Sequence, residues 1–212
     1  MTVYAESVIS SSVVTSDKER RILDAAGSLF LRYGVKRTSI DDVAREAGIA
    51  KGTIYLYYAS KERLFAAVAQ RICTDLDRSV CAAAAGPGSL AERLAAMLDA
   101  RVGALRRLLA QSPHVAELIE SKATLASDVL TVHERRMNQR LRAFLRDGNI
   151  VHEGAPQMFV AAAIGALHTG DSSERAYRTR LLALVETLLT GLQHSTAIPR
   201  SPRAGRQKTL PT

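Results

Sequence analysis

The chain has 212 residues, 47% of them hydrophobic, and a formal net charge of +8 with a pI near 9.9. This composition indicates a globular protein of one or two domains with enough apolar residues to bury a core. Ala and Leu dominate, there is no Trp, and strand-like alternation is nearly absent, so we expect an all-α fold.

The first residues and the cysteines bear on location and redox chemistry. Met1 to Thr15 has neither a basic start nor a sustained apolar run, so it does not resemble a secretory signal. No later segment approaches twenty consecutive apolar residues, and we expect a cytoplasmic protein. Cys73 and Cys81 are eight apart on a predicted helix, a rise of about 12 Å. That is too far for a direct bridge, so packing is favoured over a redox switch.

A short amphipathic helix is predicted after Thr38. Apolar residues recur at i, i+3, i+4 and i+7, which places them on one face; they are Ile40, Val43, Ala44 and Ala47. Thr38 with Asp41 three residues later gives a capping-box signal, so the helix is expected to begin near Thr38. Gly48 supplies the left-handed conformation that ends such a helix, after which the chain turns.

A second short helix follows the turn, from Lys51 to Tyr58. Ile54 and Tyr58 are four apart and are expected to face inward. The residues left for the other surfaces carry basic, hydroxyl and phenol groups that suit phosphates and base edges; they are Lys51, Gly52, Thr53, Tyr55 and Tyr57. Two helices joined in this way are typical of a helix-turn-helix that reads DNA.

The same residues, taken with their neighbours, resemble a known family. An earlier predicted helix contributes Ile22, Ala25, Ala26, Leu29 and Phe30, followed by Tyr33-Gly34, Thr38-Ser39-Ile40, Val43-Ala44, Ala47-Gly48, Lys51-Gly52-Thr53-Ile54-Tyr55, Ser60-Lys61-Glu62 and Leu64-Phe65. In this order, Ser16 to Phe65 resembles the DNA-binding domain of the TetR family of bacterial transcriptional repressors. The rest of the chain agrees with that family in length and helical character.

The resemblance implies specific roles for residues of this domain. Contacts to double-stranded DNA fall on Thr38, Ser39, Lys51, Gly52, Thr53, Tyr55, Tyr57 and Lys61. For Thr38 and Ser39 the role is a phosphate contact at the amino end of their helix, beside simple capping. Two positions depart from the family pattern. Ala50 lacks the hydroxyl that often caps the recognition helix, and Leu56 replaces a ring, which suggests an apolar contact such as a thymine methyl.

The remainder of the chain is predicted to form further helices. One runs from the N-cap Ser60 to the break at Gly86-Pro87-Gly88. Ser89 with Glu92 opens the next stretch, which is either one long helix or two helices with a joint near Gly103. An amphipathic run from Val115 to Leu145 is expected to break near Ser121 to Leu125. The last two helices are Phe159 to Leu167, with Pro156 in the first turn, and Tyr177 to Leu192. They form either an internal core or half of a four-helix dimer interface, and the resemblance favours the interface.

The predicted organisation has four parts. Residues 1–15 form a disordered arm, 16–65 the three-helix helix-turn-helix domain, 66–194 a larger helical domain for effector binding and dimerisation, and 195–212 a disordered basic tail. The tail carries four Arg or Lys residues and no acidic residue, so nonspecific DNA contact is its alternative role.

Effector residues are expected among polar or adaptable side chains on the central apolar stretches. The candidates are Met97, Arg101, His133, Met137, Phe144 and Phe159, with His114, Asn138, Met158 and His168 also considered. Each has a plainer interpretation as a surface or core residue. The sequence does not identify the effector.

Two other functional classes were weighed. The five histidines are scattered, and the chain has no HExxH, CxxC, GxSxG or phosphate-binding glycine loop, so neither catalysis nor a cofactor is expected. An architectural DNA-binding protein without an effector would keep the same helix-turn-helix. The helical portion of over a hundred residues that follows argues against this alternative.

Overall fold

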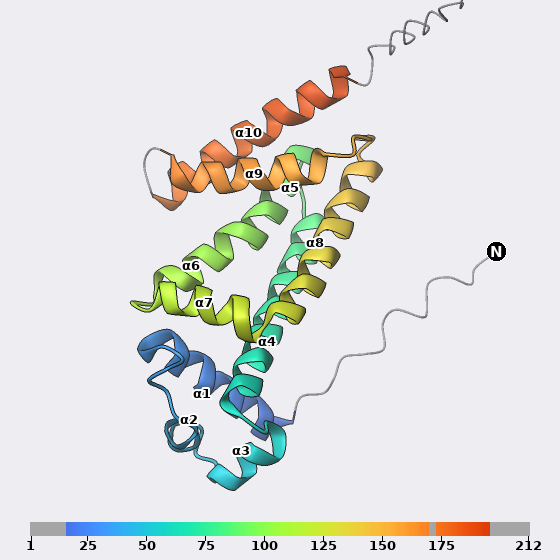
Figure 1. The fold of residues 1–212 in the computed structure, drawn as a ribbon. Helices are drawn as coiled ribbons and strands as arrows, with labels where there is room; N and C mark the ends of the chain where they lie inside the picture. Colours follow the sequence, from blue (N-terminus) through green and yellow to red (C-terminus); the bar gives the residue numbers. More distant parts are fainter. Residues whose placement is uncertain (1–15, 170–172, 196–212) are drawn as a thin grey trace, which may run out of the picture. The chain divides into compact units, whose positions relative to one another are not determined.

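The computed structural model describes residues 16–169 and 173–195, and these residues are helical with no strand among them (Figure 1). The expected all-α fold is therefore confirmed. The expected arm at 1–15 and the basic tail at 196–212 lie outside the described residues. Within the described part, no helix is long and apolar enough to cross a membrane.

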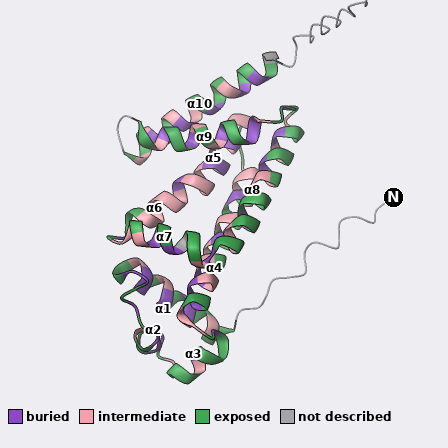
Figure 2. Cartoon of the chain, viewed as in Figure 1, coloured by how far each residue is buried: buried purple, intermediate pink, exposed green. Residues whose placement is uncertain are grey.

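The described residues fall into two compact units. The first comprises 16–79 and 104–136, and the second comprises 80–103, 137–169 and 173–195. Each unit has its own core of buried apolar side chains. Figure 2 shows buried residues along one face of most helices, with exposed residues on the opposite face.

The first unit begins with α1 (Asp17–Tyr33), α2 (Ile40–Ala47) and α3 (Lys51–Tyr57). It also contains most of α4 (Lys61–Ala84), α6 (Ala104–Ala110), α7 (Val115–Leu125) and the first part of α8 (Ser127–Asp147). Phe30 of α1 meets Phe65 of α4 edge to face with ring centroids 5.6 Å apart. Ile22 and Ile54 are completely buried in the same core, so α1, α3 and α4 share one interior.

The second unit contains α5 (Leu90–Leu98), a π-helical turn (Asp99–Gly103), the end of α8, α9 (Ala155–His168) and α10 (Glu174–Ser195). Ser89 and Glu92 form the expected capping box at the start of α5. The expected joint near Gly103 is the π turn, where the chain passes from α5 to α6. Pro156 occupies the first turn of α9 as expected, and α9 packs against α10.

One local expectation was wrong by a single residue. The capping box of α2 pairs Ser39 with Asp42 instead of Thr38 with Asp41, and the helix begins at Ile40. The break expected near Ser121 to Leu125 is found at Ala126, between α7 and α8. Ala126 is buried in the first core, so packing sets the place of the bend.

The uncapped start of α3 gives a stability prediction. Ala50 is the N-cap, has an extended backbone and makes no side-chain hydrogen bond to the helix. Ala50→Thr supplies a hydroxyl acceptor and is expected to raise the free energy of unfolding by about 1 kcal/mol in urea denaturation. Ala50→Val is the control, because Val has the shape of Thr without the oxygen. Equal stability of the two variants would contradict the capping argument.

Candidate nucleic-acid interface

The third helix presents one buried face and one exposed face. Ile54 is completely buried and Tyr58 is nearly so, as the sequence predicts. The Tyr58 hydroxyl donates to Glu19 Oε1 at 3.0 Å, and burial raises the pKa of this phenol well above its ordinary range, so it stays neutral. These contacts fix the rotation of α3 about its axis. The opposite face, shown exposed in Figure 2, is therefore free for a partner.

The exposed face of α3 combines aromatic, aliphatic and basic groups. Tyr55 is 47% exposed, Tyr57 38% and Leu56 85%. Lys51 and Gly52 are also exposed, and an added Cβ on Gly52 would meet no atom within 4 Å. A DNA backbone has room to approach α3 closely at this glycine. Large apolar side chains exposed on a short helix are typical of binding surfaces.

Acidic groups moderate the charge of this face. Lys51 Nζ donates to Asp41 Oδ2 at 2.7 Å, and this hydrogen bond to the carboxylate raises the pKa of Lys51. The segment from Asp17 to Leu64 holds 10 Lys or Arg against 7 Asp or Glu. Lys51 is thus a cation with a local counter-charge, which any anion approaching it would have to displace or tolerate.

Tyr57 has a hydrogen bond within the domain. Its hydroxyl lies 3.1 Å from Ser16 Oγ, the side chain that caps α1 through the Glu19 amide. The contact joins the end of α3 to the start of α1. The Tyr57 hydroxyl is therefore held in place by Ser16. A DNA contact by Tyr57 would use its ring or the remaining hydrogen-bonding capacity of its hydroxyl.

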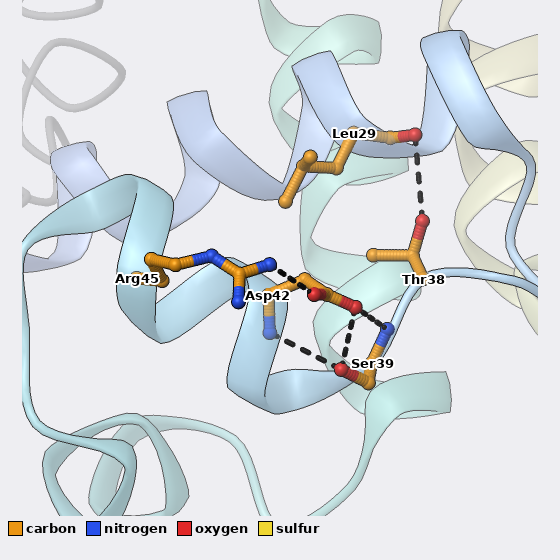
Figure 3. A network of polar contacts seen from close by, with 5 residues as sticks. All are labelled: Leu29, Thr38, Ser39, Asp42 and Arg45. Atoms are coloured by element: carbon orange, nitrogen blue, oxygen red, sulfur yellow. Dashed lines mark hydrogen bonds and ion pairs between the residues drawn. The ribbon is translucent and has the colours of Figure 1, made fainter.

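The loop before α2 holds Thr38 and Ser39 in different environments (Figure 3). Thr38 is 2% exposed, and its hydroxyl donates to the Gly34 carbonyl at 2.7 Å. A longer contact of 3.4 Å reaches the Leu29 carbonyl. The Thr38 hydroxyl is thus buried and closes the turn, which agrees with the capping alternative, and the phosphate contact stays a prediction.

Ser39 remains exposed but belongs to the capping box. Its amide and hydroxyl both donate to Asp42 Oδ2, at 3.0 and 2.6 Å, while the Asp42 amide donates to Ser39 Oγ. The Ser39 hydroxyl and amide lower the pKa of the Asp42 carboxyl, which Arg45 also contacts at 2.5 Å. A carboxylate thus already occupies the amino end of α2, and a phosphate approaching Ser39 would meet this negative charge.

Lys61 is directed at the same loop. Its ammonium donates to the Val35 carbonyl at 2.9 Å and lies 3.4 Å from the Lys36 carbonyl. These bonds hold the α1–α2 loop, and the DNA contact expected for Lys61 from the sequence stays a prediction. Thr53, half-buried in the middle of α3, contributes only a partly exposed hydroxyl.

Helix α7 contacts this loop, and the segment before α7 contacts the end of α1, through residues that the sequence did not single out. The Lys36 amide donates to Glu117 Oε1 at 2.6 Å, and the Ser112 hydroxyl donates to the Leu31 carbonyl at 2.6 Å. Gly34 has a φ of 81°, and an added Cβ would lie 2.6 Å from Glu117 Oε2. Partners 81 residues apart in sequence leave no local pattern, so only the fold identifies them.

The expected effector residues do not form one site. Met97, Arg101 and Met137 line a small cavity in the second unit. Phe159 is completely buried in the second core, and Phe144 packs under the Arg93 guanidinium, which lies 5.3 Å from its ring centroid. His133 belongs to the first unit, where its Nδ1 lies 3.0 Å from Asp77 Oδ1.

Comparison with known proteins supports the geometry. Residues 22–68 match the model of a family described as "Bacterial regulatory proteins, tetR family". A TetR-like transcriptional regulator from Rhodococcus sp. RHA1 has a similar structure, with a TM-score of 0.57 and 27% identity over 82% of this chain and 96% of that one. The chain is thus similar to the TetR family of transcriptional regulators, in sequence over its N-terminal helices and in fold over most of its length.

Curated relatives match over the N-terminal segment. An uncharacterized HTH-type transcriptional regulator of Bacillus subtilis, YvdT, is 42% identical over 60 residues, which are 28% of this chain and 31% of that protein. An HTH-type transcriptional repressor of Streptomyces coelicolor is 43% identical over 60 residues, with the same two shares. The chain thus spans about a third of the length of these relatives, so their likeness concerns the DNA-binding domain.

A double-mutant cycle tests how α7 supports the loop. Gly34→Ala is expected to cost at least about 1 kcal/mol of unfolding free energy, because it adds a side chain at positive φ and a clash with Glu117. Glu117→Ala removes one hydrogen bond and is expected to cost about 1 kcal/mol. Combined, the two should cost less than their sum by at least about 0.5 kcal/mol, since the clash partner is gone. The measurement is urea denaturation of all four proteins.

The control for this cycle is a second acidic residue of α7 that lies near the same loop. Glu120→Ala removes an exposed carboxylate 3.6 Å from Lys36 Nζ and is expected to change stability by less than about 0.5 kcal/mol. Strict additivity of the Gly34 and Glu117 substitutions would show that the two positions do not interact, and would contradict the support that α7 gives to the loop.

Proposed function

We propose that this TetR-like protein is a transcriptional repressor that binds a palindromic DNA operator as a homodimer and is released by a small-molecule effector. The observation that carries the proposal is the exposed face of α3, where Lys51, Tyr55 and Leu56 project from a helix whose other face is locked in the core. A major groove is about 12 Å wide and admits such a helix. The cytoplasm remains the expected location.

Within this proposal the DNA contacts divide by role. Lys51 and the phenols of Tyr55 and Tyr57 favour the phosphate backbone, which fixes the position of α3 on the duplex. Gly52 permits close approach, and Leu56 is placed to read a base edge. Thr53 and Ser39 retain a secondary role, while Thr38 and Lys61 act indirectly by shaping the α1–α2 loop.

Substitution of α3 tests the DNA-binding assignment. Lys51→Ala and Tyr55→Ala are each expected to weaken operator binding about fivefold or more, from roughly 1–3 kcal/mol per lost contact, with Lys51→Ala also lowering the salt dependence by about one counterion. Asp41→Asn should strengthen binding, because it removes the counter-charge beside Lys51. Fluorescence anisotropy over a salt series measures all three.

The control for charge loss is Arg146→Ala, an exposed arginine on the part of α8 that belongs to the second unit. Its operator affinity is expected to stay within about twofold of the unmodified protein, in line with the small effect of surface changes. Unchanged affinity in both Lys51→Ala and Tyr55→Ala, with folding intact by circular dichroism, would rule out α3 as the recognition helix.

The proposed contact between Leu56 and a thymine methyl is tested by removing that one methyl group from the DNA. If Leu56 contacts a thymine methyl, replacing that thymine by deoxyuridine removes about 0.8 kcal/mol, close to fourfold in affinity per half-site. Each thymine of the operator is replaced in turn, and binding is measured for the unmodified protein and for Leu56→Ala. At the thymine whose replacement weakens binding by the unmodified protein, the same replacement should leave the affinity of Leu56→Ala unchanged. Sensitivity at no position would remove Leu56 from base recognition.

The proposed dimer interface is the exposed side of α9 and α10. On α9 the exposed residues Met158, Ala161, Gly165 and His168 recur at helical spacing, and on α10 Leu184, Thr187 and Gly191 do the same. An added Cβ on Gly165 or Gly191 would meet nothing within 4 Å, so each glycine leaves open space for a neighbouring helix. Small residues permit close helix approach, and a two-fold axis there would pair two recognition helices about 34 Å apart.

Charge placed on this face is expected to separate the subunits. Ile164 of α9 is 45% exposed, and Ile164→Arg should convert a dimer to a monomer in size-exclusion chromatography with light scattering, because an unpaired charge would be buried. Ile119→Arg on α7 is the matched control, since Ile119 is 52% exposed in the other unit. A dimer that persists in Ile164→Arg, or that is lost equally in Ile119→Arg, would contradict this interface.

The alternative function is an architectural DNA-binding protein without an effector. It shares α3 and the family fold, but its binding would rest on phosphate contacts alone and would fall steeply with salt at every sequence. Leu56 favours the regulator, because an 85% exposed aliphatic side chain on α3 adds nothing to phosphate binding.

A further inference from the structure

Most of the cations around α3 are already engaged within the protein. The segment from Asp17 to Leu64 holds ten Lys or Arg residues. Four of them are paired with a carboxylate, namely Arg20, Lys36, Arg45 and Lys51. Arg21 and Lys61 donate to backbone carbonyls, and the Arg32 guanidinium lies 5.8 Å from the centroid of a tyrosine ring. Each of these seven side chains has an internal contact that a phosphate would have to replace or share.

Three cations of the segment are left, and all three are exposed: Lys18, Arg37 and Arg63. Among residues 16–169 and 173–195, no group forms a hydrogen bond, an ion pair or a ring contact with any of these three side chains. Such a charge keeps its attraction for an anion, because no carboxylate is paired with it. DNA binding gains affinity from cations of this kind, since each one that neutralises a phosphate releases bound counterions.

Lys18 lies near the carboxyl end of α3. It is in the first turn of α1, two residues after Ser16, whose hydroxyl lies 3.1 Å from the Tyr57 hydroxyl. Glu19, the next residue, accepts a hydrogen bond from the Tyr58 hydroxyl at 3.0 Å. Two contacts thus hold the start of α1 against the end of α3.

Arg37 lies near the opposite end of α3. It belongs to the loop before α2, and Asp41 in the first turn of α2 accepts from Lys51, the first residue of α3, at 2.7 Å. The preceding residue, Lys36, reaches α7 instead, where its Nζ lies 3.6 Å from Glu120 Oε2. The start of α2, with Arg37 before it, therefore adjoins the start of α3.

Arg63 completes the border of α3, because it lies in the first turn of α4, the helix that follows α3 along the chain. Helix α3 has seven residues and is about 10 Å long. A major groove is about 12 Å wide and has a phosphate backbone on each side. Cations at the two ends of α3 are thus spaced to meet both backbones of a groove that α3 enters.

We propose that Lys18, Arg37 and Arg63 form a phosphate clamp that binds the DNA backbone on both sides of α3. The clamp supplies the uncompensated charge that Lys51, countered by Asp41, does not supply. It fixes the position of α3 on the duplex and carries no sequence preference of its own. The proposal rests on the proposed function, because it adds contacts to the same DNA interface.

The salt dependence of DNA binding tests the clamp. Glutamine keeps a polar side chain without the charge, so the variants are Lys18→Gln, Arg37→Gln, Arg63→Gln and the combination of all three. Fluorescence anisotropy of the full chain is measured over a salt series with two labelled duplexes. One is an operator selected from genomic DNA, and the other is its scrambled sequence of the same length.

The control is Arg135→Gln, which removes one exposed cation outside the clamp. Arg135 lies on α8 two residues beyond His133, whose Nδ1 is 3.0 Å from Asp77 Oδ1 of α4. Asp77 is sixteen residues beyond the first residue of α4, which is about 24 Å along this helix. The control therefore changes the net charge by the same amount at a distance from α3.

Each single clamp variant is expected to lower the slope of log affinity against log salt by about 0.9 per bound subunit, on both duplexes. A fourfold rise in salt then costs the variant about 3.5-fold less affinity than it costs the unmodified protein. The combined variant should lose about 2.7 from the slope, and Arg135→Gln should leave it unchanged. The ratio of operator to scrambled affinity should stay within about twofold, because phosphate contacts carry no sequence information.

Two results would overturn the clamp. One is a combined variant that is folded by circular dichroism and keeps the salt slope of the unmodified protein. The other is an equal fall of the slope in Arg135→Gln, which would reduce the effect to net charge. Equal affinity of the unmodified protein for both duplexes would overturn the proposed regulator instead, and the slopes on the scrambled duplex would still decide the clamp.

Discussion

Burial of one face of α3 is the constraint on which the rest of the interface depends. Seven residues make two turns, too few for a helix to be stable alone in water, and this helix also lacks a side-chain cap. Its conformation therefore comes from packing, with Ile54 completely buried and Tyr58 bonded to Glu19. The same packing fixes which residues point outward. Stability and the proposed DNA recognition are thus linked through two side chains that lie outside the proposed interface.

A second level of support acts on the loop before α2. Thr38 closes the turn onto the Gly34 carbonyl, Lys61 binds the Val35 carbonyl from α4, and Glu117 of α7 receives the Lys36 amide. One hydrogen bond within the loop and two from helices α4 and α7 thus hold the loop backbone in place. Helix α7 belongs to the same compact unit as α1 to α3. A displacement of α7 would therefore move Glu117, the acceptor of the Lys36 amide, and would act directly on this loop.

Much of the fold could be predicted from the sequence because its signals are local. The left-handed C-cap at Gly48, with a φ of 62°, the capping box at Ser89 and the first-turn proline of α9 each depend on neighbours within a turn. The capping box of α2 was wrong by one residue because Thr38-Ser39 and Asp41-Asp42 offer two overlapping pairs. Burial of Thr38 decides between them, and burial is not a local property.

The parts of the site that escaped prediction depend on contacts between distant segments. For Lys61 the sequence predicts a DNA contact because the residue is basic and lies near α3, but its bond to a carbonyl 26 residues away leaves no local pattern. Glu117 and Ser112 gave no signal, since their partners lie in α1 and the loop after it. Of the expected effector residues, Arg101, Met97 and Met137 meet at one cavity, while Phe159 is a core residue.

The measurement that tests the central claim most directly is genome-wide selection of DNA fragments bound by the purified protein, with competitor DNA and at raised salt. The account predicts a small set of fragments sharing a palindrome whose half-sites are about one helical turn apart, and loss of their enrichment in Lys51→Ala. Diffuse, salt-sensitive binding with no shared sequence would contradict a dimeric regulator that reads DNA through α3.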